Sequence, residues 1–153
     1  MKTRGFEVVA PEHRHHPDVQ IRLPQRSSRQ SAGYDFYTPI AFALNPGERM
    51  TLTTDVKCFM LQDEYLTIHV RSSIGARAIM VTNTVGVVDS DFYSNAQNDG
   101  NIHILLHNIG SDVFRAEVGD RIAQGIFCKY LLADGDDLEA GTIRQGGYGH
   151  SGR

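Results

Sequence analysis

The sequence lacks several features that define whole classes of protein. Its 153 residues contain no tryptophan and only two cysteines. The longest unbroken apolar run, residues 40–44, is far shorter than the ~20 residues that cross a bilayer, so we expect no membrane-spanning helix. The N-terminal segment MKTRGFEVVAPEHRHH lacks the apolar region of a secretory signal peptide, so we expect no secretion signal.

The chain also lacks a basic excess. A net charge of -3 gives none of the long-range attraction on which sequence-independent binding of DNA or RNA depends, so we expect no nucleic-acid partner. For the same reason, the basic stretch Arg22, Arg26 and Arg29 indicates a solvated face. The hydrophobic content of 41% argues against disorder, and the length fits one domain.

The two cysteines, Cys58 and Cys128, lie in apolar surroundings. They are compatible with a disulfide, but reduced thiols in the core of a cytoplasmic protein are the favoured interpretation.

Strand-like alternation dominates the rest of the chain. Apolar residues recur at every second position in residues 48–61, 66–70, 102–106 and 122–132, with turn residues between these runs. Short strands at regular spacing predict an all-β sandwich, barrel or jelly roll. The one helical candidate is a turn or two around Ile74–Met80. We predict that two segments are held less firmly by the rest of the chain. They are Ala10–Pro24 and the Gly- and Asp-rich end from Asp134 onward.

Three histidines, His13, His15 and His16, lie in the first of these segments. A metal site is one interpretation, but their spacing matches no closed zinc set and no cysteine is near them. A solvated loop is the favoured interpretation.

Five short segments do not fit a purely structural role. They are SAGYDFYT (31–38), RSS (71–73), NTVGVVDSD (83–91), GDRIAQ (119–124) and RQGGYGHSG (144–152). Arginine and hydroxyl donors suit phosphate oxygens. Gln124 shares an apolar face with Ile122 and Ile126, and a buried amide needs a specific hydrogen-bond partner. Each segment alone also has a structural interpretation: Asp89 as a turn cap, Arg71 as a partner of Asp35, and the glycine-rich end as disorder.

Together, in this order and spacing, the five segments resemble the five motifs of the trimeric dUTPase family over residues 22–152. The resemblance implies an antiparallel jelly-roll-like β-barrel over residues 1–143 and a mobile glycine-rich tail over residues 144–153 that closes over the active site. It implies a homotrimer with shared active sites, and hydrolysis of dUTP to dUMP and pyrophosphate with Mg²⁺ on the triphosphate.

The resemblance also assigns roles to individual residues. Asp89 falls at the position of the general base that activates water, and Asn83 at the position that reads uracil. Asp35 matches the acid that supports Arg71 and contacts the metal through water. The full set of substrate-binding positions is Arg71, Ser72, Ser73, Asn83, Phe92, Gln124, Arg144, Tyr148, Gly149 and Ser151.

Four features depart from the family pattern. Phe92 replaces a Tyr that packs on deoxyribose, and Tyr148 replaces a Phe that stacks on uracil. His150 stands where a hydroxyl residue is usual. The segment Tyr93–Asp99 is longer than the usual turn, and we expect it to affect the shape of the uracil pocket.

Two alternatives remain. A dCTP deaminase would need a catalytic Glu on the strand NIHILLHN, where this chain has Leu105. A regulatory module that binds a protein partner would use the histidine-bearing loop or the Tyr93–Asp99 segment as its surface. Nothing in the sequence tests for such a partner.

Overall fold

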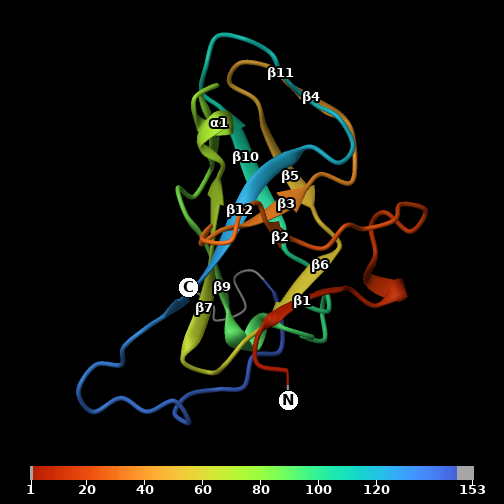
Figure 1. Ribbon diagram of the computed structural model, residues 1–153. Coiled ribbons are helices and arrows are strands. Elements are labelled where there is room, and N and C mark those ends of the chain that lie inside the picture. The colour runs from red at the N-terminus through yellow and green to blue at the C-terminus, as the bar shows by residue number, and fades with distance from the viewer. Residues whose placement is uncertain (1, 148–153) are drawn as a thin grey trace.

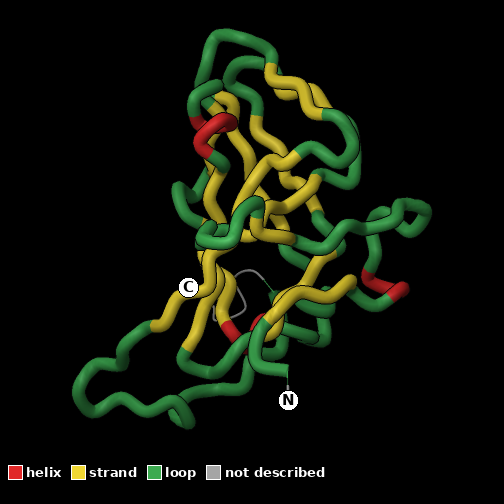
Figure 2. The backbone as a smooth tube through the Cα atoms, viewed as in Figure 1, coloured by secondary structure: helices red, strands yellow, loops and turns green. Residues whose placement is uncertain are grey.

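Figures 1 and 2 show the computed structural model of the chain, which describes residues 2–147. Strands and connecting loops make up nearly all of it, and helices are confined to short turns (Figure 2). The strands are β1 (Gly5–Val8), β2 (Gln25–Arg26), β3 (Tyr34–Tyr37), β4 (Phe42–Leu44), β5 (Arg49–Thr53), β6 (Val56–Phe59), β7 (Glu64–Val70), β8 (Ile79–Val81), β9 (Gly86–Asp89), β10 (His103–Asn108), β11 (Phe114–Ala116) and β12 (Arg121–Lys129). The helical segments are η1 (Pro11–His13), α1 (Ser72–Gly75) and η2 (Ser90–Phe92).

The largest sheet is five-stranded and antiparallel, in the order β2-β3-β12-β7-β9. A three-stranded sheet has the order β5-β10-β8, and two further pairs join β1 to β6 and β4 to β11. One hydrophobic cluster contains Phe36 and Leu66 of the larger sheet together with Leu52 and Ile104 of the smaller one, all fully buried. The predicted all-β fold with at most one short helix is confirmed, since α1 is the single α-helix in residues 2–147.

Two local expectations were wrong. Residues 48–61 do not form one strand but two, β5 and β6, because Asp55 adopts a left-handed conformation (φ 57°) that ends the alternation. The helix also comes earlier than residues 74–80: α1 ends at Gly75, and Ile79 already begins strand β8.

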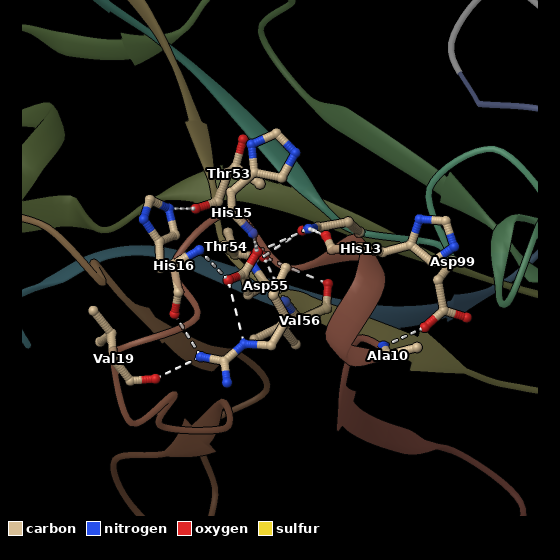
Figure 3. Close-up of polar contacts among 12 residues, drawn as sticks. Ala10, His13, His15, His16, Val19, Thr53, Thr54, Asp55, Val56 and Asp99 are labelled. Carbon is tan, nitrogen blue, oxygen red and sulfur yellow. Dashed lines mark hydrogen bonds and ion pairs between the residues drawn. The ribbon is translucent and has the colours of Figure 1, made fainter.

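The N-terminal loop is held more firmly than the sequence predicts. Asp55, fully buried, accepts hydrogen bonds from the backbone N–H groups of His15 (2.9 Å) and His16 (2.8 Å) and from the side-chain amide of Asn101 (2.9 Å) (Figure 3). Nε2 of His16 also lies 3.0 Å from the carbonyl oxygen of Thr53. The histidine-bearing segment is therefore anchored to the barrel through its backbone.

Both cysteines are unpaired, and burial raises the pKa of the Cys58 thiol to about 12. No helix within the described part of the chain is long and apolar enough to cross a membrane.

Candidate active site

A first group of candidate residues lies where strands β3, β7 and β12 run side by side. Asp35 on β3 pairs across the sheet with Gln124 on β12, which pairs in turn with His69 on β7. Arg71 directly follows β7, and its Nε lies 2.9 Å from Oδ1 of Asp35, a carboxylate that is only 4% exposed. This partly buried ion pair fixes the direction of the guanidinium and leaves its remaining N–H groups to bind an anion.

Arg121 adds a second cation to this group. Its NH1 lies 3.5 Å from Oδ2 of Asp35, so both carboxylate oxygens have a guanidinium partner. Two arginines around one aspartate leave a positive balance, which suits phosphate oxygens. Ser72 and Ser73 stand at the start of α1 with exposed side chains, next to Arg71.

The side chain of Gln124 lies over Gly33. Its Nε2 donates to the carbonyl oxygen of Val70 at 3.5 Å, which is the specific partner that its sequence position predicts. A Cβ on Gly33 would come within 2.2 Å of Oε1 of Gln124, so only glycine leaves room for this amide. The absence of a side chain at Gly33 thus leaves room for Gln124, a candidate phosphate ligand.

A second group lies in the connection from β8 to β9, two strands of different sheets, and at the end of β9. Asn83 is exposed in the turn between these strands, and Asp89 is the last residue of β9. The side chain of Asp89 is 55% exposed, and its Oδ2 lies 2.8 Å from NH2 of Arg144. Nε of the same arginine donates to Oδ1 of Asp91, also at 2.8 Å.

Phe92 lies beneath this ion-pair cluster. Its side chain is 5% exposed, and the guanidinium carbon of Arg144 lies 5.7 Å from the ring centroid. A cavity of about 440 Å³ adjoins the cluster, and its lining includes Asp89, Ser90, Asp91 and residues 138–144.

Asp89 and Arg71 lie apart in the single chain. Asp89 pairs with Tyr65 near the start of β7, whereas Arg71 follows the other end of that strand. At a rise of ~3.3 Å per residue, the two positions are about 20 Å apart along β7. The single chain therefore does not bring Arg71 and Asp89 into contact with each other.

Comparisons with known proteins show the family of the chain. The family model described as dUTPase matches residues 19–152. The deoxyuridine 5'-triphosphate nucleotidohydrolase of Lactococcus lactis subsp. lactis is 36% identical over 153 residues, covering 99% of each chain. The chain belongs to the dUTPase family. The crystal structure of a dUTPase from Streptococcus mutans superimposes with a TM-score of 0.73 at 32% identity, covering 86% of this chain and 99% of that one. A dUTPase from phage phi11 of S. aureus, whose structure contains a structural Mg(II) ion, shares the fold at 16% identity with a TM-score of 0.68, covering 91% of this chain and 98% of that one.

Within this dUTPase chain, the structure adds three residues to those predicted from sequence: Asp91, Arg121 and Gln97. The first two stand inside the segments DSD and GDRIAQ, where their charge was the available signal. Gln97 accepts a hydrogen bond from the backbone N–H of Gly147 at 2.6 Å, and the sequence carries no signal for this long-range contact. Tyr148, Gly149, His150 and Ser151 lie outside the described residues, so their roles stay predictions.

The predicted effect of the long segment Tyr93–Asp99 on the uracil pocket also stays a prediction. The structure places this segment against β1 and β6 and against the tail. Among residues 2–147, no three His, Cys, Asp or Glu side chains are grouped so as to hold a metal ion.

Proposed function

We propose that this dUTPase hydrolyses dUTP to dUMP and pyrophosphate by attack of a water that Asp89 activates. The observation that carries this role is the exposed carboxylate of Asp89 beside Arg144. A carboxylate can accept the proton of an attacking water, and a positioned general base contributes ~10²–10⁴-fold to a rate. Phosphoryl transfer otherwise needs positioning and charge neutralisation, which arginine and hydroxyl donors supply.

The phosphates bind at Arg71, Ser72, Ser73 and Gln124 in this proposal. The partly buried Asp35–Arg71 pair supports it, because a guanidinium already held on one side is ordered before the ligand arrives. Arg144 binds the terminal phosphate. Its ion pair with Asp89 breaks as the nucleotide binds, and phosphate takes the place of the carboxylate. That exchange would also uncover the ring of Phe92, which then packs against the deoxyribose.

The active site is completed by a second copy of the chain. Arg71 and Asp89 lie about 20 Å apart along β7, which supports a site where the phosphate ligands of one subunit meet Asp89 of another. We therefore infer a homotrimer with shared sites, the assembly that the five motifs imply.

The contacts of Asp35 bear on how a Mg²⁺ ion would be held. Both carboxylate oxygens of Asp35 are engaged by arginines, so this residue fits a contact through water and does not fit a direct metal ligand. The residues present therefore fit a Mg²⁺ ion that is held mainly by the triphosphate, where it would neutralise phosphate charge. Asp35 keeps Arg71 in place beside it.

Base recognition uses the hairpin around Asn83, with Tyr148 stacking on the uracil. We infer a cytoplasmic location from the unpaired thiols of Cys58 and Cys128 together with the nucleotide substrate.

The decisive experiment measures pyrophosphate release from dUTP, dTTP, dCTP and UTP, with and without Mg²⁺. Of the four nucleotides, we expect only dUTP to release pyrophosphate efficiently, and only when Mg²⁺ is present. A pocket discriminates strongly when the wrong base or sugar leaves its polar groups unpaired or clashes with it. Comparable kcat/KM values for dUTP and dTTP would contradict the proposed uracil pocket.

A further inference from the structure

A second cavity, of about 230 Å³, adjoins the group formed by Asp35, Arg71 and Arg121. Four arginines line it: Arg71, Arg77, Arg115 and Arg121. Two of them, Arg77 and Arg115, lie outside the five motif segments and have no role in the proposed reaction. A guanidinium stays charged at every physiological pH, so the cavity concentrates positive charge on a chain whose net charge is -3.

The cavity is built from two parts of the fold that meet at one end of the barrel (Figure 1). Arg71, Ile74 and Arg77 are spaced by three residues along α1 and the turn that follows it, so their side chains share one side of this turn. β11 and the start of β12 contribute Arg115 and Arg121. The lining also includes three buried apolar side chains, those of Phe114, Ala116 and Ile122.

An aromatic ring helps to fix the position of Arg77. The guanidinium carbon of Arg77 lies 4.5 Å from the ring centroid of Phe114, which is only 3% exposed. Such a cation–π contact orders the guanidinium without using its N–H groups. Within residues 2–147, neither Arg77 nor Arg115 forms an ion pair with a carboxylate. Both side chains therefore keep hydrogen-bond donors for a ligand.

The carboxylates at this cavity do not balance its arginines. Asp35 is shared by Arg71 and Arg121. Asp120 also lines the cavity, and its Oδ2 accepts a hydrogen bond from the backbone N–H of Glu117 at 2.8 Å. Four arginines against two aspartates leave an excess of two positive charges. A small anion with at least two negative charges and several oxygen acceptors matches this excess.

We propose that the cavity is a second anion site, which binds inorganic pyrophosphate next to the catalytic phosphate site. The choice of ligand rests on the proposed function, because hydrolysis of dUTP would release pyrophosphate beside Arg71. Arg71 and Arg121 border both sites, whereas Arg77 and Arg115 belong to the second site alone. A volume of about 230 Å³ suits a diphosphate, since pockets for drug-sized molecules have about 300–1,000 Å³.

The test is titration calorimetry of pyrophosphate with the full chain, alone and with a saturating non-hydrolysable dUTP analogue and Mg²⁺. With the analogue bound to the catalytic ligands, we expect one further pyrophosphate per chain. Arg115→Ala should raise the Kd of this pyrophosphate about 10-fold, because a hydrogen bond between charged groups is lost. Arg115→Lys keeps the charge and should raise the Kd only about threefold.

Two further variants complete the comparison. Arg77→Ala should also raise the Kd about 10-fold. Because it uncovers Phe114 as well, its melting temperature is measured alongside, and the exposed Arg115 supplies the variant that leaves the core untouched. Arg49→Ala is the matched control, since Arg49 is an exposed arginine on β5 outside the cavity, and it should leave the Kd unchanged.

Three results would count against the inference. Loss of all pyrophosphate binding in the presence of the analogue would confine the anion to the catalytic ligands and overturn the second site. An unchanged Kd in both Arg77→Ala and Arg115→Ala would overturn it too. Inorganic phosphate has fewer oxygens to share among the arginines, so it should bind at least about 10-fold more weakly. Equal affinity would overturn the choice of pyrophosphate.

The inference and the proposed function fail separately, because binding is measured without turnover. A chain that binds pyrophosphate through Arg115 but does not hydrolyse dUTP would overturn the proposed reaction alone. A chain that hydrolyses dUTP but binds no pyrophosphate beside the analogue would overturn the second site alone.

Discussion

Arg144 and Asp89 are ion-pair partners, with NH2 of the guanidinium 2.8 Å from Oδ2 of the carboxylate. In the proposed mechanism these residues act on different parts of the substrate, one on the terminal phosphate and the other on the attacking water. Without nucleotide, the ion pair therefore keeps both side chains away from their proposed roles. Because Asp89 is 55% exposed, the pair contributes only about 0–1 kcal/mol. An incoming triphosphate, which carries more charge, displaces Asp89 at little cost.

Replacing Asp89 tests the general base directly. Asp89→Asn should lower kcat by about 10²–10⁴-fold, because the amide cannot accept the proton of water. Folding should be unaffected, since the side chain is largely exposed. Steady-state kinetics with dUTP and the binding of a non-hydrolysable analogue are the two measurements. Near-normal turnover would rule out Asp89 as the base.

The tail should matter for activity and little for stability. Deleting residues 143–153 removes Arg144 and its contacts with Asp89 and Asp91, two aspartates whose side chains are 55% exposed. We expect the melting temperature and the assembly state to change little, and most dUTP hydrolysis to be lost. Deleting residues 148–153 alone is the matched comparison, because it keeps Arg144 and Gly147. Full turnover by the longer deletion would show that the tail has no part in catalysis.

The strands could be predicted where one face of the strand is buried and the other is not. In β10, Ile104 and Leu106 are buried while His103 and His107 are only partly buried, and this alternation is visible in the sequence. The break at Asp55 was not predictable, because its conformation depends on partners about 40 residues before and 46 residues after it. The local pattern of apolar and polar residues does not indicate such long-range contacts.

The same distinction holds for the candidate site. Arg71 and Asp35 are both chemically conspicuous, so the sequence named them, and the structure shows that they form a pair. The contact between Gln97 and Gly147 joins two residues of ordinary composition, and only the path of the tail brings them together. Charge and hydrogen-bonding capacity identify candidates, whereas the chain path decides which of them meet.

The packing of Gln124 over Gly33 predicts a variant with altered binding and a stable fold. In Gly33→Ala, the new Cβ would clash with Oε1 of Gln124, the end of a flexible side chain that can move away. We expect KM for dUTP to rise several-fold because a phosphate ligand is displaced, with a loss of about 1 kcal/mol in the free energy of unfolding. Gly75→Ala is the control, since its Cβ meets only Val70 at an ordinary 3.7 Å. An unchanged KM in Gly33→Ala would show that Gln124 does not bind phosphate.

Asp55 gives a prediction about stability in acid. Burial alone would raise its pKa, but hydrogen bonds from the amides of His15, Asn101 and His16 outweigh this effect and hold the pKa below the ordinary value. A carboxyl group whose pKa is lowered by folding stabilises the protein fully above its unfolded pKa of ~3.9, and this contribution is lost as the pH falls through the folded pKa. Acid should therefore release the N-terminal loop.

Two substitutions separate the charge of Asp55 from its backbone conformation. Asp55→Asn tolerates the left-handed conformation but accepts fewer hydrogen bonds, so we expect a loss of about 1–2 kcal/mol at pH 7. Asp55→Ala also strains the backbone and should lose about 3 kcal/mol or more. Urea unfolding between pH 3 and pH 7, with Asp18→Asn as a control at an exposed aspartate of the N-terminal loop, measures both effects. The difference between the unmodified chain and Asp55→Asn should shrink below about pH 4, because protonation then removes the charge that the substitution removes. A difference that stayed constant down to pH 3 would show that the carboxylate charge does not anchor the loop.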